Sequence, residues 1–172
     1  MRAPESERAQ PLNLGSAGIY VHIPFCKRKC AYCDFASYPG LENLFNDYTN
    51  AVCAEIEREA SSWGAVCFET IFIGGGTPTL IPTSLTTAML CHCQRHLAVL
   101  PTAEITIEAN PGTISLADLC ALRLAGVNRL SLGVQSLADD ELRLLGRIHT
   151  AREALEAFRL AREAGFHNIN LD

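Results

Sequence analysis

The chain has 172 residues, of which 48% are hydrophobic and 19% charged, so it holds enough apolar sequence to bury one globular core. Its net charge of -5 provides no basic surface for a phosphate backbone, which argues against nucleic acid as a partner. No apolar run approaches the roughly 20 residues that cross a bilayer, and the N-terminus lacks the apolar stretch of a secretion signal. We therefore expect a cytoplasmic protein without a transmembrane segment.

Residues 1–18 are rich in Pro, Ser and Glu and show no hydrophobic period, so we expect a flexible leader there. After it, apolar strand-like runs alternate with amphipathic helical stretches. This alternation predicts an α/β fold in which helices connect the strands of a parallel sheet. The expected strands are 19–23, 70–73, 104–109, 129–134 and 168–172.

Helix signals fall between these expected strands. Ser115 and Thr150 each precede a helical stretch and have an acidic residue three positions later, the pattern of a capping box. Cys53 lies inside the first helical stretch and is explained by packing alone. The apolar face of that helix is expected from the spacing of Leu41, Leu44, Phe45, Tyr48, Val52 and Ile56.

The chain contains eight cysteines. Without a secretion signal, metal binding or burial explains them better than disulfides. Cys26, Cys30 and Cys33 stand together in one loop with the spacing C-x3-C-x2-C. Three thiolates can bind three irons of a cubane, whereas a closed electron-transfer cluster uses four cysteines. The fourth iron would keep an open position, which is the mark of a chemically active metal centre.

A zinc ion bound by the three cysteines and His22 is the alternative, because three thiolates and one imidazole also suit a tetrahedral ion. His22 lies two residues after Tyr20 in a strand-like run, so both side chains leave the same face of the sheet. His22 therefore also fits an ordinary packed histidine. The loop by itself leaves iron and zinc open.

Glycine and polar residues follow other expected strands. Gly75, Gly76 and Thr77 follow the second, where missing β-carbons let a ligand approach the backbone. A tight strand-to-helix turn explains these glycines equally well. Glu108 and Gln135 fall at the carboxyl ends of the third and fourth strands, the rim where parallel α/β folds bind ligands.

Two charged residues complete this group. Arg147 is suited to reach a carboxylate or a ribose, and Asp172 ends the fifth expected strand, where it is suited to accept hydrogen bonds from ribose hydroxyls. Taken singly, Arg147 also fits a surface charge, and Glu108 fits a solvated loop residue.

The run YVHIPFCKRKCAYC, from Tyr20 to Cys33, resembles the signature of the radical S-adenosylmethionine (SAM) superfamily. YVHIPFC resembles one branch of it, the oxygen-independent coproporphyrinogen III oxidases and the HemW-type haem chaperones. The resemblance extends to Asp172 and implies a [4Fe-4S] cluster on Cys26, Cys30 and Cys33 whose open iron chelates SAM. Reduction of the sulfonium then gives a 5'-deoxyadenosyl radical.

The resemblance implies these cofactor-binding residues: Tyr20, Tyr32, Gly75, Gly76, Thr77, Glu108, Gln135, Arg147 and Asp172. These residues and motifs match the family in the same order along the chain, and this match makes a zinc site the lesser alternative.

Phe35 distinguishes the two kinds of protein in this branch. The porphyrinogen oxidases carry a further cysteine two residues after the third, where this chain has Phe35, and their N-terminal region is longer. Both differences favour a haem chaperone, with haem as ligand, haem-acceptor proteins as partners and an electron donor for the cluster. The alternatives are an oxidase acting on porphyrinogen and an inactive metal-binding fragment, so the resemblance leaves open whether the chain is an enzyme.

The resemblance also implies a partial parallel (β/α) barrel of the radical SAM type, truncated after about five strands. The core would span 19–172 and lack the last βα unit and the C-terminal domain. A parallel strand normally has neighbours and covered faces, so an incomplete barrel exposes an edge that favours association. We expect the chain by itself to bind a cluster weakly or to aggregate.

A second metal site in the run CHCQRH, from Cys91 to His96, is rejected on helical geometry. Residues two apart on a helix point to different faces. Cys91 and Cys93 therefore cannot bind the same ion without unwinding the helix.

Overall fold

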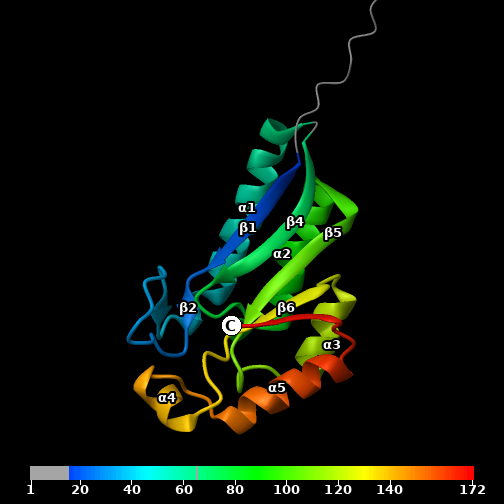
Figure 1. The fold of residues 1–172 in the computed structure, drawn as a ribbon. Helices are drawn as coiled ribbons and strands as arrows, with labels where there is room; N and C mark the ends of the chain where they lie inside the picture. Colours follow the sequence, from blue (N-terminus) through cyan, green and yellow to red (C-terminus); the bar gives the residue numbers. More distant parts are fainter. Residues whose placement is uncertain (1–15, 65) are drawn as a thin grey trace, which may run out of the picture.

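The computed structural model describes residues 16–64 and 66–172. Its main strands are β1 (Ala17–Ile23), β4 (Cys67–Gly75), β5 (Ala98–Ala109), β6 (Arg129–Leu132) and β7 (Asn168–Leu171). They form one open sheet in the order β1-β4-β5-β6-β7, and every neighbouring pair is parallel (Figure 1). All five expected strands are present, which confirms the α/β prediction. β1 begins two residues before the expected start, and residues 1–15 of the expected leader lie outside the described residues.

The helices are α1 (Phe45–Trp63), α2 (Thr83–His96), α3 (Leu116–Leu124), α4 (Asp139–Leu144) and α5 (Ala151–Glu163). Two short 3-10 turns, Glu42–Leu44 and Pro78–Leu80, precede α1 and α2. Both expected capping boxes are present. The Ser115 and Thr150 hydroxyls accept hydrogen bonds from the backbone N–H groups of Asp118 and Glu153, and the carboxylates of Asp118 and Glu153 accept from the backbone N–H groups of Ser115 and Thr150. Within the described residues, no helix is both long and apolar enough to cross a membrane.

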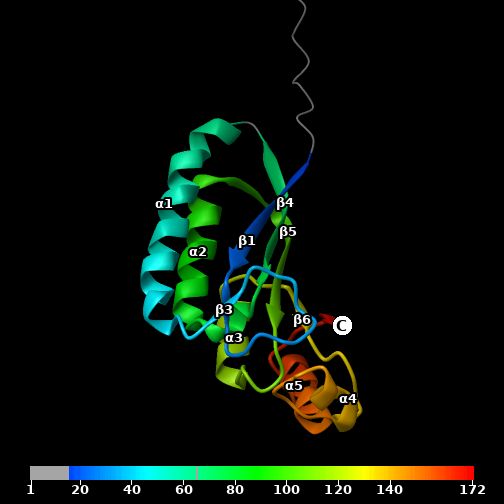
Figure 2. The ribbon, with the colours of Figure 1, turned by 90° about the vertical axis from the view of Figure 1, so that its left-hand side faces the viewer.

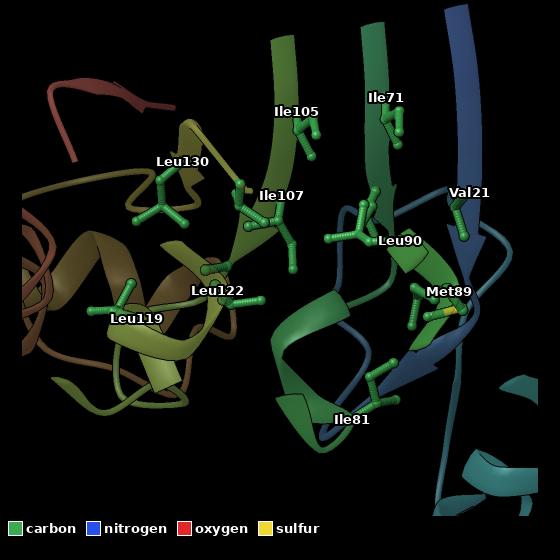
Figure 3. Close-up of a cluster of buried hydrophobic side chains, with 14 of the residues drawn as sticks. Val21, Ile71, Ile81, Met89, Leu90, Ile105, Ile107, Leu119, Leu122 and Leu130 are labelled. Carbon is green, nitrogen blue, oxygen red and sulfur yellow. The ribbon is translucent and has the colours of Figure 1, made fainter. Parts of the chain in front are cut away.

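One face of the sheet packs against the helices and forms the hydrophobic core. Alternate residues of the strands, including Ile71, Ile107 and Leu130, are fully buried there against Met89 of α2 and Leu119 of α3 (Figure 3). Complete burial of an aliphatic side chain contributes about 1.5–3 kcal/mol each. This face therefore supplies most of the stabilisation of the fold.

The buried cysteines of the helices belong to the same core. Cys53 of α1 and Cys93 of α2 are both buried within it. Burial raises the pKa of the Cys93 thiol to about 11, so the thiol stays protonated at neutral pH. Packing explains Cys53 without any further function, as expected.

The opposite face of the sheet carries polar side chains next to the stacked rings of Tyr20 and Phe72, because side chains alternate along a strand. We call it the polar face. His22, Glu108 and Ser131 lie on this face, and the register places His22 beside Gly74 and Glu108 beside Ser131. A β-carbon on Gly74 would lie 2.9 Å from the Glu108 carboxylate oxygen Oε2, so glycine leaves room for that side chain. The polar face and the carboxyl ends of the strands together position the candidate site.

Candidate functional site

The cysteine loop lies between two short strands that the sequence pattern did not predict, β2 (Phe25–Cys26) and β3 (Tyr38–Pro39). The Tyr38 N–H donates to the Pro24 carbonyl at 2.8 Å, which closes the loop at its base. The Lys29 ammonium donates to the Phe35 carbonyl at 3.2 Å and braces the loop from within. The three cysteines are thereby held beside the carboxyl end of β1, and all eight cysteines of the chain are free thiols.

His22 anchors this loop through its ring. Its Nε2 lies 2.8 Å from the Ala36 carbonyl and its Nδ1 lies 3.2 Å from the Tyr20 hydroxyl. A carbonyl only accepts, so Nε2 donates and Nδ1 accepts. Both ring nitrogens are therefore occupied by hydrogen bonds, which leaves His22 a structural role rather than that of a fourth zinc ligand.

The cysteine sulfurs are also not gathered as a single ion would require. Zinc binds thiolates at about 2.3 Å, which puts sulfurs of one tetrahedral site within roughly 4 Å of one another. Within 16–64 and 66–172, no three potential ligand atoms that include a loop cysteine lie within 4.8 Å of one another. A cubane gives each thiolate its own iron and so needs a wider spacing. Among the described residues, the loop therefore holds no preformed three-ligand zinc site.

The glycine-rich turn after β4 docks directly on the cysteine loop. The Gly76 N–H donates to the Ile23 carbonyl and the Thr77 N–H to the Phe25 carbonyl, both at 2.7 Å. A β-carbon on Gly76 would lie 2.5 Å from the Phe25 carbonyl oxygen and 3.0 Å from the Cys26 sulfur. The missing β-carbon thus makes room for the protein's own backbone and for the Cys26 side chain.

Glu108 is fixed at the end of β5 rather than solvated as a loop residue. Its Oε2 accepts the Gly75 N–H at 2.9 Å. Burial raises the pKa of Glu108; the Gly75 hydrogen bond opposes this, while the charge of Asp172 adds to it. The carboxyl group therefore binds a proton more readily than an ordinary glutamate.

Arg147 connects three strand-end segments. Its guanidinium donates to the Asn110 side-chain oxygen at 2.6 Å and to the Gly133 carbonyl. The same group reaches the Tyr32 hydroxyl at 3.3 Å and the Cys30 sulfur at 3.6 Å. Its buried Nε has no hydrogen-bond partner among the described residues. Arg147 is therefore part of the site and places positive charge beside the Cys30 sulfur.

Asp172 and Gln135 meet at the ends of β7 and β6. The Asp172 Oδ1 accepts the Ser131 hydroxyl at 3.1 Å and also the Asn170 side-chain amide, and the Gln135 N–H donates to the Asp172 backbone carbonyl at 3.0 Å. Gln135 has a φ of 69°, and no other non-glycine residue among those described has a positive φ. Such backbone conformations are sparsely populated and cluster at ligand sites.

These residues converge on one cleft at the carboxyl ends of the strands. The three loop cysteines and eight of the nine other predicted residues line it. Those eight are Tyr32, Gly75, Gly76, Thr77, Glu108, Gln135, Arg147 and Asp172. Segments separated by most of the chain thus supply one concave site that combines thiol, charged and amide groups with apolar surface.

Tyr20 is the exception. Its ring packs on Phe72 with the centroids 6.0 Å apart, it is about half exposed, and it borders a neighbouring groove instead of the cleft. A strand rises about 3.3 Å per residue, so Tyr20 lies roughly 10 Å before the end of β1. Its hydroxyl lies 3.2 Å from the His22 Nδ1, and this hydrogen bond connects it to the histidine that anchors the cysteine loop.

Asn110 is a site residue that sequence reasoning missed. Its side-chain amide donates to the Thr77 hydroxyl at 3.0 Å while its oxygen accepts from Arg147. Ser131 and Gly133 also line the cleft without having been predicted. Asn110 directly follows β5, so its place at a strand end was a signal that could have found it.

The family model of the radical SAM superfamily matches residues 20–172, so the chain belongs to that superfamily. In sequence it is 39% identical over 170 residues to the haem chaperone HemW of Escherichia coli (strain K12). It is 41% identical over 154 residues to the haem chaperone HemW of Bacillus subtilis (strain 168). These alignments cover 94% and 89% of this chain but 43% and 41% of the relatives, so the chain spans about two fifths of their length.

The fold matches a solved structure from the same branch. Coproporphyrinogen III oxidase (HemN) from Escherichia coli, described as a radical SAM enzyme, superposes with a TM-score of 0.83 at 31% identity. The match covers 90% of this chain and 36% of that one. These comparisons confirm the predicted resemblance to the superfamily and to both kinds of protein in the branch, and they confirm the partial parallel barrel.

Proposed function

We propose that the chain binds a [4Fe-4S] cluster through Cys26, Cys30 and Cys33 and binds SAM in the adjoining cleft. We propose further that it acts as a HemW-like haem chaperone that passes haem to acceptor proteins. The observation that carries the cofactor proposal is the convergence of the cysteine loop with the glycine turn and the strand ends in a single cleft. When bound, the cluster supplies one-electron reduction to SAM at its open iron.

The residues of the cleft are suited to the parts of SAM. The Gly75–Thr77 backbone runs beside Cys26, where a ligand can lie close to the main chain. Arg147 supplies positive charge for a carboxylate. Asp172 uses Oδ1 for Ser131 and Asn170, and its other oxygen is suited to accept ribose hydroxyls.

The haem part of the proposal rests on two observations. Curated relatives at 39% and 41% identity are named haem chaperones. Phe35, where the porphyrinogen oxidases carry a further cysteine, lines the cleft and is 58% exposed. An exposed aromatic ring at this mouth is suited to the face of a flat apolar macrocycle.

The test is anaerobic reconstitution of the chain with iron and sulfide. Because the incomplete barrel is expected to associate and to bind a cluster weakly, the monomeric brown fraction is measured. We expect four irons per chain in that fraction, and its reduced cluster should change its electron paramagnetic resonance spectrum when SAM is added. Haem should then be retained on gel filtration and pass to an apo-acceptor protein. A well-folded chain that takes up no cluster would contradict the cofactor proposal. A cluster-loaded protein that retains no haem would contradict the chaperone proposal alone.

The second candidate is an oxygen-independent coproporphyrinogen III oxidase. The likeness to the HemN structure favours it. Oxygen-free turnover of coproporphyrinogen III with SAM and an electron donor would separate the two. Formation of the decarboxylated porphyrinogen supports the oxidase, and its absence in a cluster-loaded protein that binds haem supports the chaperone.

A further inference from the structure

Two histidines and a glutamate gather on the helical layer, away from the cleft. His92 and His96 are four residues apart on α2, so they share one face of that helix. Their rings stack with centroids 5.7 Å apart. The α1 helix lies alongside α2 (Figure 2) and presents Glu57 to both rings. We name these three residues the interhelix triad.

The ligand atoms of the interhelix triad are spaced as around a single ion. The Glu57 Oε1 lies 3.1 Å from the His92 Nε2 and 3.6 Å from the His96 Nε2, and all three atoms lie within 4.8 Å of one another. Zinc bonded at about 2.0–2.2 Å to nitrogen and oxygen separates neighbouring tetrahedral ligands by roughly 3.3–3.6 Å. Small side-chain adjustments bring the triad to that spacing.

The hydrogen bonding of His92 calls for a proton or a metal ion between its ring and Glu57. Its Nδ1 lies 3.0 Å from the Ala88 carbonyl, which only accepts, so Nδ1 carries a proton and donates it. The Nε2 of the neutral ring then directs a lone pair at the Glu57 carboxylate, which also only accepts. Two such lone pairs 3.1 Å apart repel unless a proton or a metal ion stands between them. A carbonyl bond on the far nitrogen is the usual support of a metal-bound histidine.

We propose that Glu57, His92 and His96 form a second metal site, which takes a divalent first-row transition ion such as Zn²⁺. Two imidazoles and one carboxylate suit zinc, cobalt, nickel or copper better than magnesium or calcium, which prefer oxygen ligands. The two histidine side chains are 27% and 29% exposed and that of Glu57 is 51% exposed, so solvent can reach the site and complete the coordination. The site is independent of the cluster proposal.

This proposal departs from the sequence-based rejection of a second metal site in the run from Cys91 to His96, which was argued from the spacing of the two cysteines. Those cysteines still do not share an ion, because Cys91 is exposed and Cys93 is buried. The histidines of the same run differ, since four residues bring them to one face and a second helix supplies the third ligand. A bound ion would join α1 to α2. It would stabilise the folded chain by mass action, because the unfolded chain does not hold the three ligands together.

The experiment uses the full chain with its cluster reconstituted anaerobically, titrated with ZnCl2 in a calorimeter. We expect one zinc per chain outside the cluster, with affinity falling at least tenfold in His92→Gln, His96→Gln and Glu57→Gln. The exposed histidine His167 provides the matched control, and His167→Gln should bind as the parent does. Zinc should raise the Tm of the parent and the control but not that of the three variants, and MgCl2 should raise neither.

X-ray absorption at the zinc edge locates the ion. Nitrogen and oxygen neighbours near 2.0–2.1 Å without sulfur support the interhelix triad, whereas sulfur near 2.3 Å would assign zinc to cysteines and overturn the proposal. Unchanged zinc affinity in the three variants, or no binding by the folded parent, would also overturn it. Circular dichroism of each variant shows that lost binding does not reflect lost folding.

Discussion

The two faces of the same sheet differ in how their side chains contribute to the protein. On β5, Ile107 is fully buried against the helices, while its neighbour Glu108 points the other way and accepts a hydrogen bond from the glycine turn. The helical face consists of apolar side chains that contribute through burial, and many such contacts share the stabilisation. The polar face and its rim depend on single hydrogen bonds and on missing β-carbons. Stability is thus spread over one face, and the site depends on individual atoms of the other.

The largest effect should come from the cysteine loop. Cys30→Ser removes one of the three proposed cluster ligands, so we expect loss of the bound cluster and its visible absorbance while the denaturation midpoint of the cluster-free protein is unchanged. Iron analysis and chemical denaturation measure the two effects. Cys67→Ser changes an exposed cysteine at the start of β4 and should retain the full cluster. A stoichiometric cluster in Cys30→Ser would rule out the proposed ligand set.

On the helical face, we expect a substitution to lower the stability of the fold without lowering the amount of bound cluster. Ile107→Ala removes a fully buried side chain from the centre of the core, which costs about 2–5 kcal/mol of unfolding free energy. Urea denaturation measures this loss. At low temperature, where the variant is still folded, it should take up the same amount of cluster as the parent. A parallel loss of cluster and stability would show that the two faces are not separable.

A smaller effect should come from the contact between the glycine turn and the loop. Gly76→Ala forces a β-carbon against the Phe25 carbonyl and the Cys26 sulfur, and such overpacking typically costs about 1–3 kcal/mol. Gly133→Ala is the matched comparison, because its β-carbon meets the ends of the Asn110 and Arg147 side chains, which can move. We expect the larger loss of stability and of cluster in Gly76→Ala. Equal losses would mean that the loop backbone adapts as easily as side chains.

The smallest effect is a dependence on pH. Because burial raises the pKa of Glu108 above its ordinary value of 4.5, the folded chain binds this proton more readily than the unfolded chain does. Glu108 therefore destabilises the fold as the pH rises above 4.5 and through the raised pKa. Glu108→Gln stays neutral and keeps an acceptor for the Gly75 N–H. Unfolding free energies measured from pH 4 to about 7 should shift in favour of the variant, whereas a difference independent of pH would refute the assignment.

Local patterns in the sequence determined the elements and the place of the site. Apolar periodicity gave the five strands, and Ser115 and Thr150 marked the starts of two helices because capping depends on residues three positions apart. The strand-end positions of Glu108, Gln135 and Asp172 predicted one shared rim, since parallel strands end at one edge of a sheet.

Contacts between distant segments were decided by the tertiary structure alone. Arg147 meets Cys30 from 117 positions away and reaches Asn110 through the same guanidinium, while Tyr20 is kept back from the rim by its place along β1. The interhelix triad likewise exists only because α1 packs beside α2. No local sequence pattern predicts these contacts, because they depend on how the elements pack and on which rotamer a long side chain adopts. The sequence by itself therefore determined the edge of the sheet that carries the site, and packing decided which side chains meet there.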